Sequence, residues 1–340
     1  MKIVKLIGVL ILVGGLFVGF LFAKKYYIAY TAMKELDNTV LATEITLTDL
    51  EEIKKIQQGE IYSKELINLS EIPPLWKKIS ENDTLKKEHK HLDDINFFLI
   101  TYKSDSLLVN GIIAEPKKEG KFPVVIFNRG GNREVGKVAK AKTLYALVYA
   151  VAYLVKEGYV VIASCYRESD EFGGRDINDV LNLIETAKSI KKADPSRIGM
   201  YGWSRGGMMT YLALKQSDRI TTAVVGNGPS DLFELIKDRP EMEIRVCAEL
   251  IPNYQENKEK ELKKRSVIYW ADALNKNSSL LILCGTKDKR VNPNQAEKIA
   301  KKLVDIDYDV ELRKFETNHG FSDKKNELYE LLTQWFNEKL

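Results

Sequence analysis

One serine of this chain lies in a pattern that could supply a nucleophile. Ser204 is flanked as Gly202-Trp203-Ser204-Arg205-Gly206, after an apolar β-branched run and before a run with helical spacing. A nucleophile elbow is a sharp strand-to-helix turn, and it needs small residues on both sides of the serine because larger side chains would clash. A lone serine is nevertheless a poor nucleophile without a base and an acid. The rest of the chain therefore decides between a nucleophile and an ordinary polar residue in a glycine-rich loop.

Three histidines, His89, His91 and His319, are the candidates for the base. His89 and His91 lie in a charged stretch before the predicted sheet, where we expect solvated surface residues. A metal pair is the alternative there, but no third ligand lies nearby in the sequence. His319 follows the last predicted strand, and ligands bind at the carboxyl ends of parallel strands. His319 is therefore the candidate base, with a purely structural loop histidine as the alternative.

The acid is expected between the serine and the histidine, because the fold that carries the elbow orders its triad in this way. Asp288 lies in that interval, just after the predicted strand 279–285. It would accept the Nδ1–H of His319 and hold the tautomer whose Nε2 takes the serine proton. Asp288 could instead only cap the next helix. Asp305 and Asp307 compete for the role, but they precede a strand and so belong to the opposite edge of the sheet.

Two backbone N–H groups should stabilise the oxyanion that forms during acyl transfer. One belongs to Arg205, the residue after the serine. The other is expected from Arg129 or Gly130, in a loop where two adjacent glycines let the backbone approach a substrate closely. The arginine side chains of this region, Arg129, Arg133 and Arg205, are candidates for binding an anionic group of the substrate.

The elements that must position these residues alternate along the chain. Apolar runs occupy 122–128, 159–165, 197–202, 220–226, 279–285 and 309–315, with helical segments between them. Continuous apolar runs are typical of strands buried on both faces, and the alternation predicts a mostly parallel sheet flanked by helices. Runs at 95–102 and 107–116 predict an antiparallel opening of the sheet. The charged residues 229–276 interrupt the alternation and predict a small helical cap insertion.

The first residues predict attachment to a membrane. Residues 6–23 carry no charge and are bracketed by lysines, and a helix of this length nearly spans a bilayer core of about 30 Å. A cleaved signal sequence is the alternative. We expect residues 1–25 to form a single-pass transmembrane helix, 26–92 a helical preface or stalk, and 93–340 an extracytoplasmic catalytic domain.

Composition excludes some classes of function. The chain has 340 residues, and its 52 basic and 48 acidic residues nearly balance, which gives no reason to expect nucleic-acid binding. Three cysteines are too few for a disulfide framework, and Cys165 and Cys284 end apolar runs, where buried free thiols are expected. We expect no metal or organic cofactor, and the sequence does not determine the oligomeric state.

Six stretches together carry a resemblance to a known family. They are FPVVIFNRGGNRE, EFGGRDINDVLNLI, RIGMYGWSRGGMMT, RSVIYWADAL, LLILCGTKDKRVNPNQ and NHGF, in this order. From about residue 93 to the end, the chain resembles the catalytic domain of the prolyl oligopeptidase family, which has the α/β-hydrolase fold. By matching position, the resemblance implies Ser204 as nucleophile, Asp288 as orienting acid and His319 as base. It also implies that Asp176 and Asp179 are structural residues that cap or salt-bridge a helix.

The chain departs from the family pattern in three places, and the first two bear on specificity for peptides. Peptidases of the family usually carry a large β-propeller before the hydrolase domain, whereas about ninety residues precede it here. Many members have a tyrosine at the position of Arg129, and the His-Gly often found before the acid loop is Cys284-Gly285 here. We expect a serine hydrolase that cleaves peptide or amide bonds. A carboxylesterase acting on small esters is the alternative, and a hydrolase-like binding protein without turnover is a further one.

Overall fold

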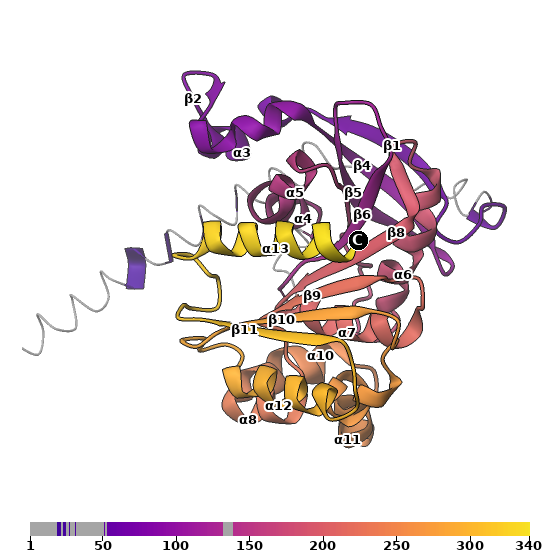
Figure 1. Ribbon diagram of the computed structural model, residues 1–340, viewed down its shortest axis with the longest axis vertical. Coiled ribbons are helices and arrows are strands. Elements are labelled where there is room, and N and C mark those ends of the chain that lie inside the picture. Colours follow the sequence, from indigo (N-terminus) through magenta and orange to yellow (C-terminus); the bar gives the residue numbers. More distant parts are fainter. Residues whose placement is uncertain are drawn as a thin grey trace, which may run out of the picture.

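The computed structural model describes residues 53–131 and 139–340, and single positions 19–21, 23, 24, 27, 31 and 51 before them. Within these residues, nine strands form one sheet in the order β1-β4-β5-β7-β6-β8-β9-β10-β11 (Figure 1). The strands are β1 Ile61–Ile67, β4 Ile95–Ser104, β5 Leu107–Pro116, β6 Phe122–Asn128, β7 Val160–Ser164, β8 Ala193–Trp203, β9 Thr222–Gly226, β10 Ser279–Gly285 and β11 Val310–Phe315. β6 to β11 pair in parallel, and β1, β4 and β5 are antiparallel additions. The predicted α/β architecture with a mostly parallel sheet is confirmed.

Helices cover both faces of the sheet. They are α3 Pro73–Ile79, α4 Ala139–Ala146, α5 Ala152–Lys156, α6 Ile177–Thr186, α7 Arg205–Gln216, α8 Leu232–Asp238, α9 Pro240–Met242, α10 Ala248–Leu250, α11 Tyr254–Arg265, α12 Pro293–Val304 and α13 Lys325–Lys339. Leu147–Val151 forms a π-helical turn between α4 and α5, and Glu243–Cys247 forms another after α9. Short helices thus fill the chain between β9 and β10, where the sequence predicts a cap.

The sheet separates two hydrophobic cores. One core packs α6, α7, α8 and α12 against one face, and the other packs α3, α4, α5 and α13 against the opposite face (Figure 1). Alternate residues of the central strand β6 enter different cores: Val124 and Ile126 face the first, Val125 and Phe127 the second. Successive side chains of a strand point to opposite faces, so a strand covered on both sides must be apolar throughout. Because both faces are packed, the positions of the strand ends are well defined, and the candidate catalytic residues follow these strand ends.

The prediction of a helical segment over 26–92 is wrong for part of its length. β1 is a strand that pairs antiparallel with β4, with Lys64 opposite Ile100. Its exposed charges are typical of an edge strand, whose outer side faces water, and such charges resemble a helix surface in sequence. After α3, the short strands β2 Ser80–Glu81 and β3 Thr84–Leu85 form a hairpin. Asn82 and Asp83 form its turn at φ of 49° and 58°, a backbone region that these two residue types tolerate.

The sequence predicts a membrane helix for the N-terminal residues. The predicted membrane helix at 6–23 falls almost wholly outside the residues that the structure describes. Among those it does describe, no helix has both the length and the apolar character needed to cross a bilayer.

Cys165, Cys247 and Cys284 are buried free thiols, as predicted for Cys165 and Cys284.

Candidate active site

Ser204 lies on a sharp turn between β8 and α7. Its backbone has φ 55° and ψ −122°, a strained conformation that non-glycine residues adopt mainly where the surrounding structure enforces it. A Cβ added to Gly202 would lie 2.1 Å from the carbonyl oxygen of Gly206, and one added to Gly206 would lie 1.8 Å from that of Asn128. Both positions must therefore be glycine. The local geometry is that of a nucleophile elbow, as the spacing predicts.

Asp288 and His319 are in direct contact. The Nδ1 of His319 lies 2.7 Å from the Oδ2 of Asp288, whose side chain is fully buried, whereas that of His319 is 12% exposed. The other carboxylate oxygen, Oδ1, accepts the backbone N–H groups of Arg290 and Val291. The helix cap is a different residue, Asn292, which precedes α12. Asp288 therefore shapes its own turn and also orients His319. The two alternative acids, Asp305 and Asp307, lie in the turn that follows α12.

Two side chains hold the loop that carries His319. The carbonyl oxygen of His319 accepts a hydrogen bond from Trp203 Nε1 at 3.2 Å and another from Asn227 Nδ2 at 2.9 Å. Trp203 directly precedes Ser204, so this contact places the histidine loop beside the elbow. Within the described part of the chain, the Ser204 hydroxyl makes no hydrogen bond. Such bonds are often long in enzymes without substrate and tighten when the substrate binds.

The loop after β6 lies against the elbow. A Cβ added to Gly130 would lie 3.0 Å from the carbonyl oxygen of Trp203 and 3.3 Å from the Cβ of Ser204. The absence of a side chain at Gly130 thus lets this backbone run beside the serine. Arg205 is the first residue of α7, and the first N–H groups of a helix have no acceptor within the helix. Both segments predicted to supply oxyanion donors therefore border Ser204.

The side chain of Arg205 points into the protein and is unsuited to binding an anionic substrate group. It is 1% exposed and is ion-paired with Asp170 at 2.5 Å and with Asp176 at 2.8 Å. Burial opposes ionisation of Asp170, but the charge and hydrogen bonds of Arg205 outweigh it and lower the pKa of that carboxyl. The hypothesis of a substrate contact is therefore wrong for this side chain, because two carboxylates already neutralise it.

Arg129 is also buried, at 2% exposure, and is bonded within the protein. Its guanidinium donates to Thr143 Oγ1 at 3.0 Å and to the carbonyl oxygen of Cys165 at 3.2 Å. The ring of Tyr166 contacts both arginines, with Arg129 Cζ 5.0 Å and Arg205 Cζ 4.7 Å from its centroid. Arg129 is therefore a structural link rather than an anion site. Arg133, the third arginine of that hypothesis, lies outside the described residues.

The acidic residues after β7 have the structural roles that the resemblance implies. Asp176 accepts the backbone N–H groups of Gly173 and Gly174 just before α6 and pairs with Arg205. Asp179 pairs with Arg167 at 2.6 Å and is wholly buried. Burial raises the pKa of Asp179 although Arg167 opposes this rise. Asp176 thus ties the start of α6 to Arg205 of the elbow, and Asp179 ties α6 to Arg167 after β7.

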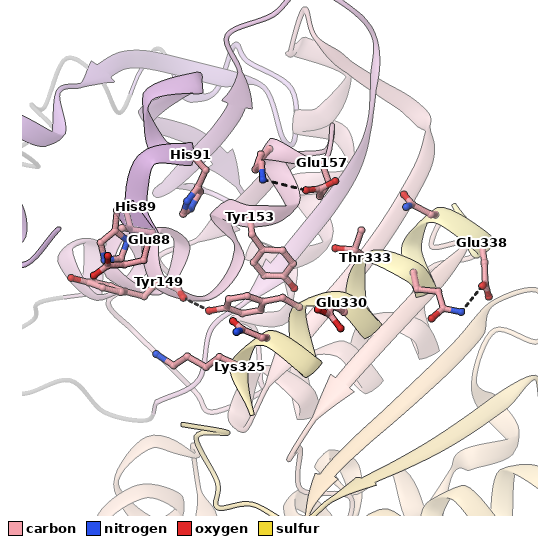
Figure 2. Close-up of a pocket in the computed structure, with 16 residues that line it drawn as sticks. Glu88, His89, His91, Tyr149, Tyr153, Glu157, Lys325, Glu330, Thr333 and Glu338 are labelled. Atoms are coloured by element: carbon pink, nitrogen blue, oxygen red, sulfur yellow. Dashed lines mark hydrogen bonds and ion pairs between the residues drawn. The ribbon is translucent and has the colours of Figure 1, made fainter. Parts of the chain in front are cut away.

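A cavity of about 1030 Å³ lies away from these residues, and none of the three triad candidates lines it. Figure 2 shows Tyr149 and Tyr153 on one side and Glu330 of α13 on the other, with His89 and His91 nearby. Both histidines are half-buried, and burial lowers the pKa of each. The expectation of solvated surface residues is therefore only partly right. Among the described residues no group of three potential ligands could hold a metal ion.

Sequence reasoning missed the residues that connect these loops. Asn227 follows β9 at the carboxyl edge of the sheet, where parallel sheets bind their ligands, and this position is the signal that could have found it. Trp203 lies inside the elbow motif, but its residue type does not indicate that its Nε1 holds the histidine loop. Asp170 lies six residues before Asp176 in a charged loop, and only the folded chain shows that both pair with one arginine.

The sheet order and the elbow define the class: the chain is an α/β hydrolase. The model of the prolyl oligopeptidase family matches residues 145–340. The chain is 26% identical over 255 residues to the uncharacterized peptidase YtmA of Bacillus subtilis, covering 72% of this chain and 95% of that one. It is 26% identical over 260 residues to the uncharacterized peptidase YuxL of the same organism, covering 69% of this chain but 38% of YuxL.

Solved structures share the fold. An acylaminoacyl peptidase of Pyrococcus horikoshii superposes with a TM-score of 0.59 at 24% identity, over 71% of this chain and 41% of that one. The chain thus spans nearly all of one relative and less than half of the other two proteins compared. It belongs to the prolyl oligopeptidase family and is a serine hydrolase of a peptidase family, as the resemblance of its six stretches implies.

Proposed function

We propose that this protein cleaves peptide or amide bonds through a triad of Ser204, His319 and Asp288. The observation that carries the proposal is the 2.7 Å contact between Asp288 and His319, on a loop that is bonded to the residue before Ser204. With the proton of the imidazole on Nδ1 and bonded to Asp288, Nε2 is left as the acceptor for the serine proton. These are the three roles that acyl transfer through a serine requires.

The proposed reaction has two halves. His319 Nε2 takes the proton of Ser204 as the hydroxyl oxygen attacks the carbonyl carbon, and it then delivers that proton to the leaving amine. An ester bond now joins Ser204 to the acyl part of the substrate. Water, deprotonated by the same nitrogen, attacks this ester and releases the acid together with the free serine. Asp288 remains ionised and stabilises the imidazolium that forms in each half.

The oxyanion donors that we propose are the backbone N–H groups of Arg205 and Gly130. Arg205 begins α7, so the positive end of the helix dipole also favours the developing charge. The ion pairs of its side chain tie the first residue of α7 to Asp170 and Asp176 in the segment before α6. Arg129, the other predicted donor, is placed by Thr143 and Cys165 so that the following glycine runs beside the serine.

A labelling experiment tests the triad. A fluorophosphonate reacts only with an activated serine, so the wild type should be labelled and S204A should not. S70A is the matched control, because Ser70 is an exposed serine near the start of α3 and should leave labelling unchanged. An unlabelled wild type would favour the hydrolase-like binding protein without turnover. Labelling that persists in S204A would exclude Ser204 as the nucleophile.

The leaving group separates the two enzymatic alternatives, since the same acyl-enzyme forms from amides and esters. The comparison uses aminoacyl-p-nitroanilides and p-nitrophenyl acetate as substrates. The assignment to a family of peptidases supports turnover of the anilides. Turnover of the ester with no detectable anilide cleavage would instead favour a carboxylesterase.

We also propose that residues 6–23 anchor the protein in a membrane and that the catalytic domain lies on the extracytoplasmic side. The support is the uncharged run between flanking lysines in the sequence. Fractionation of cells should recover the full chain with the membranes, in a form that sodium carbonate does not extract. Protease added to intact cells or spheroplasts should cleave the catalytic domain. Recovery of the full chain in the soluble fraction would contradict the anchor.

A further inference from the structure

Asn227 is a buried polar residue at the carboxyl end of β9. It is 3% exposed and has a φ of 46°, so it turns the chain in the left-handed region immediately after the strand. Its backbone N–H donates to the carbonyl oxygen of Leu283 in β10 at 2.8 Å. The residue is therefore fixed against the neighbouring strand, whose end leads to Asp288.

The carboxamide of Asn227 joins two loops. Its Oδ1 accepts the backbone N–H of Gly285 at 2.9 Å, and its Nδ2 donates to the carbonyl oxygen of His319 at 2.9 Å. A backbone N–H can only donate and a carbonyl oxygen can only accept, so these partners determine the orientation of the amide. Of the small side chains, only a carboxamide offers one donor and one acceptor in this fixed geometry.

The two bonded groups belong to the acid turn and to the base loop. Gly285 opens the turn that Asp288 closes, since the Asp288 N–H donates to the Gly285 carbonyl oxygen at 3.1 Å. His319 is the residue whose carbonyl Asn227 holds. The carboxamide thus joins the backbones of the two loops whose side chains, Asp288 and His319, make the 2.7 Å contact.

We propose that Asn227 is a positioning residue that sets the distance between Asp288 and His319. The proposal rests on the proposed triad and assigns a part to a residue whose side chain bonds to the backbone of Gly285 and His319 rather than to Ser204. Without the bridge, the base loop keeps the bond from Trp203, and backbone bonds such as Lys287 N–H to Thr317 O still join the loops. Removing the carboxamide should therefore loosen the pair without unfolding the protein.

Two substitutions separate the functions of the side chain. N227G removes the bridge without strain, because glycine accepts a positive φ. N227D is nearly isosteric and still accepts the Gly285 N–H, but it places an oxygen against the carbonyl oxygen of His319. N82G is the matched control, because Asn82 also has a positive φ, 49°, but lies exposed in the hairpin turn between β2 and β3.

The first readout is the rate of acylation by a fluorophosphonate, measured beside the melting temperature. N227G and N227D should react about 10–100-fold more slowly than the wild type, because a misplacement of about 1 Å in a catalytic group costs up to 10²-fold. For substrate turnover the loss should appear in kcat with KM nearly unchanged. N82G should react at the wild-type rate. Wild-type rates in both Asn227 variants would overturn the proposal.

The second readout does not depend on turnover. The Nδ1 proton of a histidine bonded to a carboxylate gives a far-downfield proton resonance, which H319A would assign by its loss. In N227G and N227D this resonance should shift or broaden, whereas N82G should retain it. An unchanged resonance in folded N227D would overturn the proposal even if the enzyme proved inactive on every substrate. Failure of the wild type to react with the probe would count against the triad instead.

Discussion

The Oδ2 of Asp288 lies 2.7 Å from the Nδ1 of His319, and the Oδ1 of the same carboxylate accepts two backbone N–H groups. Both oxygens are therefore committed before any substrate arrives. A carboxylate held in this way cannot rotate to follow the imidazole, so it determines the orientation of the ring. The fixed carboxylate keeps the imidazole ring of His319 in the orientation that proton transfer requires, and the turn that carries Asp288 is rigid as a result.

Replacing Asp288 by asparagine should leave the fold intact and nearly abolish activity. The amide oxygen can still accept the N–H groups of Arg290 and Val291, which leaves the NH₂ group facing His319. An NH₂ donor stabilises the imidazole tautomer that carries its proton on Nε2, and that nitrogen can then no longer accept the serine proton. We expect kcat to fall about 10⁴-fold, the loss known for this type of change in a serine protease triad. Activity within tenfold of the wild type would exclude Asp288 as the orienting acid.

Replacing Gly206 by alanine should disturb the elbow itself. The added Cβ would lie 1.8 Å from the carbonyl oxygen of Asn128, which belongs to the backbone and cannot move away cheaply. We expect a loss of about 1–3 kcal/mol in the free energy of unfolding, measured in urea, with loss of labelling by the probe. G320A is the control for stability, since a Cβ there meets its nearest neighbour at 3.6 Å. Equal stability of the two variants would contradict the described packing.

The pairing of Asp170 with Arg205 should make stability depend on acid pH. The pKa of this carboxyl lies below its ordinary value of 3.8, chiefly because Arg205 outweighs the effect of burial. The unfolded chain then binds a proton more readily than the folded one. The stabilisation is therefore complete above the ordinary value and is lost as the pH falls through the lower folded value.

The variant D170N isolates this contribution from those of the other carboxylates. At pH 7 it should be less stable than the wild type by about 1.5–3 kcal/mol, the usual range for a hydrogen bond to a charged group. Below the ordinary pKa of the carboxyl the difference should shrink toward zero. Thermal unfolding measured from pH 7 to pH 2 checks this, and a difference that stays constant over the range would contradict it.

Most of the central fold could be predicted because its signal is local. The apolar run 279–285 coincides with β10, and the run 122–128 coincides with β6, since burial on both faces requires nearly every residue to be apolar. The start of α12 also has a local signal, since the cap Asn292 is followed by Pro293 at the first helical position. Strand β1 was missed because its partner β4 begins 28 residues after it ends, and an edge strand carries charges on its open side.

The site could be predicted only in part, for a similar reason. Ser204 can be predicted from its motif, and His319 from its position after a strand. Asp288 can be predicted from the order of the triad residues along the chain. The bridge through Asn227 depends on three loops that meet only in the folded chain. The side chain of Arg205 was misjudged because arginine is usually exposed, and its burial requires two aspartates from a loop about thirty residues earlier.

Mass mapping of the covalent adduct tests the central claim most directly. The wild type is treated with a fluorophosphonate, digested and sequenced by tandem mass spectrometry, with H319A treated in parallel. The account predicts one adduct, on the oxygen of Ser204, and at least a 10³-fold slower formation of it in H319A, since the hydroxyl then lacks its base. An adduct on a different residue, or equal rates in the wild type and H319A, would contradict it.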